Sequence, residues 1–179
     1  MKFNGQINAA LTPVPFILPK GGQDAWTFLL HPLPLGFHRR LRDRGILPPT
    51  PPVKVARDSS GKPLRDPQGM ATTYFDAHHP DYLKQLDQYH LAVAVLTLKE
   101  GLRADPQVTF DSLSPENDAG PVAWMEHTMD LFHELEQAGF TAGDLLKLCQ
   151  EICRLSNLID PALNAAQRSF SAAGQNGPA

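Results

Sequence analysis

The chain has 179 residues, 42% of them hydrophobic, and a formal net charge of −3. This size and composition fit one globular domain, or a compact domain with an appended arm. No apolar run approaches the roughly 18 residues of a membrane span, and the first residues lack the order of a signal peptide. We therefore expect a cytoplasmic protein that does not interact with a membrane.

Charge is unevenly distributed along the chain. Residues 1–72 contain ten Lys or Arg and four Asp or Glu, a net charge of +6. Residues 73–179 contain six Lys or Arg and fifteen Asp or Glu, a net charge of −9. Such a split is typical of proteins with two functional surfaces or with complementary parts.

The first predicted element is a β-hairpin over residues 14–30. Two apolar runs flank residues 20–24 (KGGQD), whose glycines favour a turn because glycine adopts positive φ without steric cost. A short helical pattern with four arginines then covers residues 35–44, and Gly45 is placed to end it.

A proline-rich segment follows. Eleven of the 17 prolines lie within residues 1–67, which excludes a helical bundle there, and four cluster at residues 48–52. Residues 57–61 and 65–69 repeat an Arg-Asp-turn-Gly pattern eight residues apart. The repeat indicates a small hairpin or an arm, and the composition favours the arm.

From Pro80 onward the pattern becomes helical. One helix is predicted from Pro80 to about Arg103, and a second from Pro121 to about Ala138, before Gly139. On the second helix, the apolar side chains of Val122, Met125, Met129 and Phe132 align, with Trp124, Leu131 and Leu135 beside them.

A third helix is predicted after Thr141, which resembles the start of a capping box with Asp144. Its apolar face includes Leu145, Leu148, Cys149, Ile152 and Leu155, so we expect Cys149 and the nearby Cys153 to be buried thiols. A fourth, weakly apolar helix is predicted to begin at residues 160–161.

We therefore predict an α+β chain that is mainly α. Residues 1–45 form a small β-hairpin unit with a short basic helix, and residues 46–78 form a Pro-rich arm. Residues 79–174 form a C-terminal bundle of about four helices, and residues 175–179 are a disordered tail.

No motif of a catalytic site stands out. The sequence has no phosphate-binding glycine loop, zinc-protease histidine pair or nucleophile elbow. The cluster that most resembles a metal site comprises Asp76, His78, His79 and Asp81, with His90 further along. Neighbouring side chains in regular structure point in different directions, so we interpret this cluster as the polar start of a helix.

The second helix also carries two histidines and four acidic residues. We expect His127 and His133 at its solvent face or boundary. The acidic residues Glu126, Asp130, Glu134 and Glu136 share that polar face. We accordingly predict a binding protein without catalytic, cofactor or metal residues.

Eight of the sixteen Lys and Arg residues lie between Arg39 and Arg65. A phosphate-binding arm has such a composition, but interleaved aromatic residues are missing and acidic residues dilute the charge. A basic surface that faces a protein partner is therefore favoured over nucleic-acid binding. Its candidate partner-binding residues are Arg39, Arg40, Arg42 and Arg44.

Three features resemble the tail-assembly chaperones of long-tailed phages and prophages. A hairpin leads into residues 32–35 (PLPL) and a short helix. A helix opened by residues 80–82 (PDY) ends at residues 102–106 (LRADP). Residues 138–145 (AGFTAGDL) lead through residues 155–158 (LSNL) to a last helix that ends at Phe170.

The resemblance covers most of the chain through element order. It implies a non-enzymatic factor of the host cytoplasm that holds the tape-measure protein while tail-tube subunits polymerise around it. Such a client needs an adaptable apolar groove, which Trp124, Met125, Met129 and Phe132 are candidates to line, unless they are core residues.

Two other functions remain open, with self-association as an additional expectation. One is a structural tail or connector subunit retained in the virion, with the hairpin and arm as clamps between subunits. The other is a nucleic-acid-binding regulator that uses the basic arm.

Overall fold

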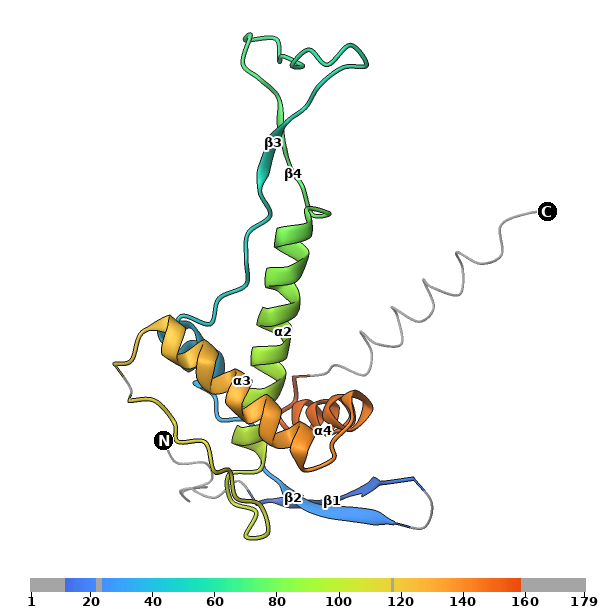
Figure 1. Ribbon diagram of the computed structural model, residues 1–179, viewed down its shortest axis with the longest axis vertical. Coiled ribbons are helices and arrows are strands. Elements are labelled where there is room, and N and C mark those ends of the chain that lie inside the picture. Colours follow the sequence, from blue (N-terminus) through green and yellow to red (C-terminus); the bar gives the residue numbers. More distant parts are fainter. Residues whose placement is uncertain (1–11, 22–23, 117, 159–179) are drawn as a thin grey trace, which may run out of the picture.

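A computed structural model describes residues 12–21, 24–116 and 118–158 (Figure 1). In chain order the elements are β1 (Val14–Pro19), β2 (Ala25–Leu30), α1 (Phe37–Asp43), β3 (Val53–Val55), β4 (Thr73–Phe75), α2 (Pro80–Gly101), α3 (Pro121–Gln137) and α4 (Ala142–Leu155). The predicted mixed, mainly helical architecture is confirmed. The helix expected at residues 160–170 and the tail at 175–179 lie outside the described residues.

The N-terminal hairpin is confirmed. β1 and β2 pair antiparallel, with Val14 opposite Leu30 and Pro19 opposite Ala25. The Lys20 N–H donates to the Asp24 carbonyl at 3.0 Å, and this hydrogen bond closes the loop between the two strands. Alternation along the strands then turns some side chains inward and others to solvent.

The hairpin, α1 and the three long helices share one hydrophobic core. Buried members from the N-terminal unit are Leu18, Phe28, Leu30, Phe37 and Leu41, and from the helices Val95, Leu98, Leu102, Trp124, Leu131, Leu148 and Ile152. The predicted N-terminal unit and the predicted helical domain therefore contribute to the same core through their described residues. Figure 1 shows α3 and α4 against the lower half of α2, with the hairpin beneath them.

The helix boundaries follow the expected local signals. Pro80 and Pro121 stand at the first position of α2 and α3. Before α4, the Asp144 N–H donates to Thr141 Oγ1 at 3.2 Å and the Thr141 N–H donates to Asp144 Oδ2 at 2.9 Å, which confirms the capping box. Gly139 follows α3 with a φ of +80°, a conformation that glycine adopts readily.

The buried face of α3 differs from the expected one. Its buried residues are Trp124, His127, Thr128, Leu131 and Leu135. Val122 and Met129 instead point outward, with 70% and 39% of their surfaces exposed. The expectation that His127 lies at the solvent face or boundary is wrong, because its ring packs 5.8 Å from that of Trp124 and is 3% exposed. His133 is exposed, as expected.

The arm is present and projects from the body (Figure 1). Its β3 and β4 strands pair antiparallel, with Val53 opposite Phe75. Of the range 46–78 predicted for the arm, Ile46 belongs to the core, where it is 3% exposed, so the arm leaves the body after this residue. The buried residues of α2 begin only at Ala92. The first half of α2 therefore extends from the body together with the arm.

Candidate functional site

The distal part of the arm consists of two turns built from the eight-residue repeat. In each turn an aspartate side chain accepts backbone hydrogen bonds and an arginine donates to a glycine carbonyl. Asp58 Oδ1 accepts the Ser60 and Lys62 N–H groups at 2.8 and 2.9 Å, and Asp66 Oδ1 accepts those of Gln68 and Met70 at 3.0 and 2.8 Å. Arg57 and Arg65 donate to the carbonyls of Gly61 and Gly69 at 2.8 and 2.6 Å.

A ring of three backbone hydrogen bonds joins the two turns to the stem of the arm. Ala56 N–H donates to Thr72 O at 2.8 Å, Thr72 N–H to Leu64 O at 2.9 Å, and Leu64 N–H to Ala56 O at 2.8 Å. The three residues are spaced by eight, the period of the repeat. We call residues 56–72 the arm tip. The arm thus also contains the small hairpin turns that the repeat indicated.

Apolar side chains are exposed along the arm. On the β3–β4 stem, Val53, Val55 and Phe75 are 59%, 38% and 65% exposed, and their register places them on one face, which we call the arm face. Lys54 lies on the other side, where its Nζ is 2.6 Å from Asp76 Oδ2. This contact raises the pKa of Lys54 and lowers the pKa of Asp76.

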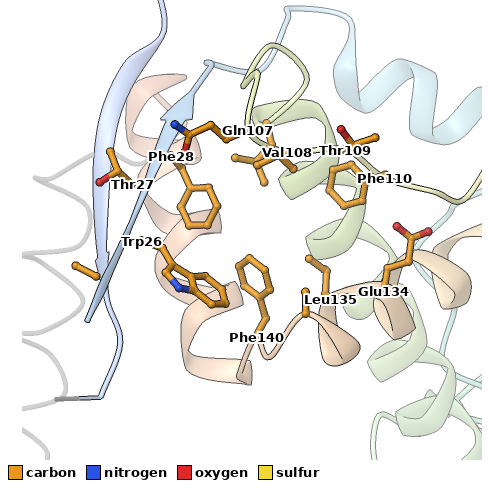
Figure 2. A pocket seen from close by; sticks show the side chains of 13 residues that line it. Trp26, Thr27, Phe28, Gln107, Val108, Thr109, Phe110, Glu134, Leu135 and Phe140 are labelled. Atoms are coloured by element: carbon orange, nitrogen blue, oxygen red, sulfur yellow. The ribbon is translucent and has the colours of Figure 1, made fainter. Parts of the chain in front are cut away.

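At the other end of the molecule the body has an aromatic pocket of about 610 Å³ (Figure 2). Its apolar side chains come from β2, from the loop after α2, and from the end of α3 and the turn that follows. They are Trp26, Phe28, Val108, Phe110, Leu135 and Phe140. The Phe140 ring lies 5.0 Å from the Trp26 ring and 5.9 Å from the Phe28 ring.

The charged residue that lines this pocket is Glu134. Its carboxylate accepts the backbone N–H groups of Asp111 and Ser112 at 2.9 and 2.5 Å. Burial raises the pKa of Glu134, but hydrogen bonding by the Ser112 side chain and by these N–H groups outweighs burial, and the net shift is downward. Glu134 thus holds the loop after α2 in place and leaves a negative charge at the pocket.

The structure does not bring the four candidate groove residues of α3 to one surface. Trp124 lies in the core with 2% of its surface exposed, and the Arg44 guanidinium stacks 3.9 Å above its ring. Met125 and Phe132 are half-buried against the core, whereas Met129 is exposed. A direct role in partner binding by Trp124 is incompatible with this position, and contacts through the other three remain predictions.

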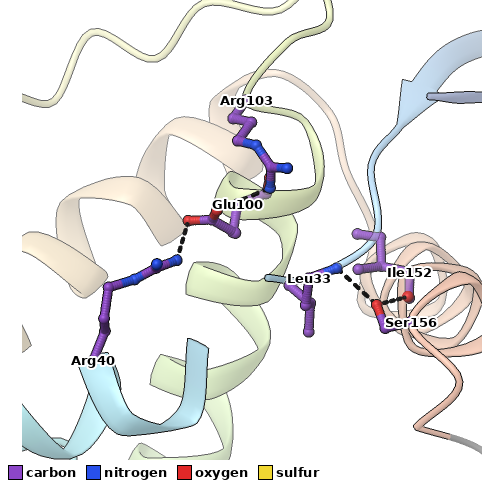
Figure 3. A network of polar contacts seen from close by, with 6 residues as sticks. All are labelled: Leu33, Arg40, Glu100, Arg103, Ile152 and Ser156. Atoms are coloured by element: carbon purple, nitrogen blue, oxygen red, sulfur yellow. Dashed lines mark hydrogen bonds and ion pairs between the residues drawn. The ribbon is translucent and has the colours of Figure 1, made fainter. Parts of the chain in front are cut away.

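The four candidate arginines differ in whether they contact other side chains of the body. Arg40 Nη2 lies 3.3 Å from Glu100 Oε2, and the same carboxylate accepts a hydrogen bond from Arg103 at 2.8 Å (Figure 3). The Arg44 guanidinium stacks on the Trp124 ring. Arg39 and Arg42 are exposed and have no ion-pair partner among residues 12–21, 24–116 and 118–158.

Ser156, from the LSNL segment, connects α4 to the chain that leaves the hairpin. Its Oγ accepts the Leu33 N–H at 2.7 Å and donates to the Ile152 carbonyl at 2.6 Å (Figure 3). The segment therefore has an identifiable structural role: it fixes the proline-containing turn before α1.

A partly buried polar pair joins α2 to α3. Lys99 Nζ lies 2.9 Å from His127 Nε2 and donates to Ser114 Oγ at 2.9 Å. Burial lowers the pKa of both Lys99 and His127. Since Lys99 donates, His127 Nε2 must accept, which requires a neutral imidazole with its proton on Nδ1. This pair was not anticipated, because no local pattern relates two positions 28 residues apart.

The expected buried cysteines are half-buried free thiols. Cys149 Sγ donates to the Ala94 carbonyl at 3.3 Å, and burial raises the Cys149 pKa to about 12. A thiol of this kind stays protonated, which is consistent with a packing role.

None of the described helices combines the length and apolar character needed to cross a membrane. In the same part of the chain, no three His, Cys, Asp or Glu residues gather closely enough to hold a metal ion. Comparisons with protein-family models, curated proteins and solved structures found no match to this chain.

Proposed function

We propose that this protein is a non-enzymatic tail-assembly chaperone of a phage or prophage, which acts in the host cytoplasm on the tape-measure protein. The observation that carries the proposal is the arm face. A projecting two-stranded stem with exposed Val53, Val55 and Phe75 cannot stabilise its own chain through these side chains, and such surfaces are typical of protein-binding elements.

The resemblance of the chain to tail-assembly chaperones supplies the client. Tape-measure proteins are long and aggregation-prone, and a client of this kind presents many apolar side chains. The arm face offers an apolar surface with free strand edges, to which an extended or helical segment can bind without any covalent chemistry.

The folded arm tip also supports a second candidate function, a tail or connector subunit retained in the particle. The hydrogen-bond ring of Ala56, Leu64 and Thr72 gives the tip a defined shape, and defined projecting arms suit permanent clamps between subunits. Whether the chain leaves before the virion is complete distinguishes the two roles.

The basic residues give less support to a nucleic-acid regulator. Of the eight between Arg39 and Arg65, five have partners within the chain. Counterion release requires cations that are free to reach phosphates, and such internal contacts reduce their number.

The test is co-expression of the tagged chain with the tape-measure protein of the same gene cluster, followed by nuclease treatment, capture and mass spectrometry. We expect capture of the client by the natural chain and loss of capture by the V53S/F75S variant. The matched control is Leu146→Ser, which removes a 61% exposed apolar side chain from α4 and should leave capture unchanged.

Three outcomes would contradict the proposal. Equal capture by the arm-face variant would show that the arm face is not the binding surface. Recovery of the chain in purified particles would favour the structural subunit. Loss of all partners after nuclease treatment would favour the nucleic-acid regulator.

A further inference from the structure

Two apolar features of the described residues are open to solvent and lie far apart. One is the arm tip, where Leu64 and Met70 are 46% and 68% exposed. The other is the aromatic pocket of about 610 Å³ on the body. Figure 1 shows the arm tip at one end of the long axis and β2, which contributes to the pocket, at the other. The tip of one molecule therefore cannot fill the pocket of the same molecule.

The two features match in chemistry. The pocket presents the rings of Trp26, Phe28, Phe110 and Phe140, as Figure 2 shows. Methionine is well suited to such a pocket, because its flexible thioether makes favourable contacts with aromatic rings. Met70 is placed at the end of a turn that Asp66 and Gly69 hold in shape, so little ordering is needed when it binds.

The two features also match in charge. The arm tip carries Arg57, Lys62 and Arg65 against two aspartates, and each aspartate has one oxygen occupied by backbone N–H groups. The pocket has Glu134 in its wall. The tip thus has a net charge of +1 and would meet a pocket wall whose charged side chain is a carboxylate, which favours their association.

From this complementarity we infer that the arm tip of one molecule binds in the aromatic pocket of a second copy of the same chain. Each molecule then donates one tip and accepts another. Such a head-to-tail contact is heterologous, so it forms a ring if the rotation between copies closes and a filament if it does not. This self-association is independent of the identity of any client.

Sedimentation velocity of the purified chain, over a concentration series into the high micromolar range, tests the inference. We expect species larger than a monomer that grow with concentration and shrink as salt is added. The tip variant L64S/M70S should weaken association at least about tenfold, because it removes both apolar side chains from the contact. Its control, Gln68→Ser, changes an exposed polar side chain of the same turn and should leave association unchanged.

A pocket variant tests the other half of the contact. Ala138 is exposed, lines the pocket and caps the C-terminus of α3, where a cation is favourable to the helix. Ala138→Arg therefore narrows the pocket and repels a basic tip without disturbing the fold. We expect a loss of association similar to that of the tip variant. Gln150→Arg, at an exposed position on α4 outside the pocket lining, is the charge-matched control.

Mixing the two variants gives the decisive result. The tip variant keeps an intact pocket and the pocket variant keeps an intact tip, so the mixture should form a one-to-one dimer and nothing larger. A monomeric natural chain at all concentrations, or no dimer in the mixture, would overturn the inference. So would equal association of both variants and the natural chain. Failure of client capture would contradict the chaperone proposal alone.

Discussion

Lys20 Nζ lies 2.6 Å from Asp144 Oδ2, although 124 residues separate them. The same ammonium group donates to the Gly139 carbonyl at 2.8 Å and sits 3.9 Å above the Trp26 ring. The end of the N-terminal hairpin is thereby attached to the turn between α3 and α4. Trp26 and Phe140, held on either side of this contact, belong to the wall of the aromatic pocket.

Lys20→Met should lower the free energy of unfolding by about 1–3 kcal/mol, because it leaves a buried carboxylate without its charged hydrogen-bond donor. Urea denaturation at neutral pH measures the change. Lys84→Met is the control, since Lys84 is exposed on the projecting half of α2. An equal loss in both variants would show that the Lys20–Asp144 contact contributes little.

Acid should remove the same contact. The hydrogen bond from Lys20, followed by that from the Thr141 N–H, lowers the pKa of Asp144 from 3.8 to about 2. A depressed carboxyl pKa contributes stability that is complete above the ordinary value and is lost as pH falls toward the folded value. Urea unfolding between those two pH values should therefore show a steeper loss for the natural chain than for Lys20→Met. Parallel curves would contradict this assignment.

Gly101→Ala should destabilise the body where α2 crosses α4. A Cβ at this position would overlap Ile152 Cδ1, and Ile152 is fully buried. We expect a loss of about 1–3 kcal/mol, the usual cost of overpacking a core. Gly143→Ala is a helical control with room for the added methyl group and should be neutral or stabilising.

The double variant G101A/I152V provides an internal check on that prediction. The new methyl group would meet both Cδ1 and Cγ1 of Ile152, and valine lacks the nearer of the two, so the two changes should cost less together than the sum of their separate effects. Thermal unfolding of the natural chain and the three variants of this cycle measures the difference. Strict additivity would show that the Cδ1 contact is not the cause of the strain.

The stability of the protein should also fall in mild acid because of His127. Burial, followed by the nearby Lys99 charge, lowers the pKa of His127 below the ordinary 6.5. The unfolded chain therefore binds a proton first as pH falls, and stability is lost from about pH 6.5 downward until the folded pKa is reached.

His127→Gln should reduce the difference in unfolding free energy between neutral and mildly acidic solution. His133→Gln, which changes an exposed histidine of the same helix, should preserve it. Imidazole NMR shifts of the natural chain give an independent measurement of the pKa. A pKa of His127 at or above 6.5 would contradict the prediction.

Changes in the arm tip should destabilise the tip without lowering the stability of the body. Gly61 and Gly69 have φ values of +82° and +81°, so alanine at either position costs about 1–2 kcal/mol in backbone strain. Because the tip is outside the common core, we expect faster hydrogen exchange at the Leu64 and Thr72 amides but an unchanged melting temperature. Gly139→Ala, with a similar φ inside the body, should lower the melting temperature instead.

The sequence predicted the features that depend on neighbouring residues. Pro80, Pro121 and the Thr141–Asp144 capping box define helix starts through local backbone chemistry. The hairpin has an equally local cause in the glycines of its turn. These elements were placed correctly because their stabilising contacts lie within a few residues.

Features that depend on distant contacts were not predictable in this way. α3 is apolar on several sides, so its sequence did not decide between a buried Trp124 and a buried Met129. The pocket depends on β2, the loop after α2 and Phe140 meeting in space. The useful hints were Phe110, an aromatic residue in a polar loop, and Phe140, directly after the helix-ending Gly139.

The hydrogen-bond ring of Ala56, Leu64 and Thr72 has a consequence for variation and for engineering. Each turn of the arm tip begins and ends at ring residues that are eight positions apart. The outer positions of a turn can therefore change in sequence without altering the stem. An epitope or fluorescent label introduced at Ser59 or Gln68 should therefore be tolerated. Such a label would mark the far end of the molecule and report where that end lies in an assembly.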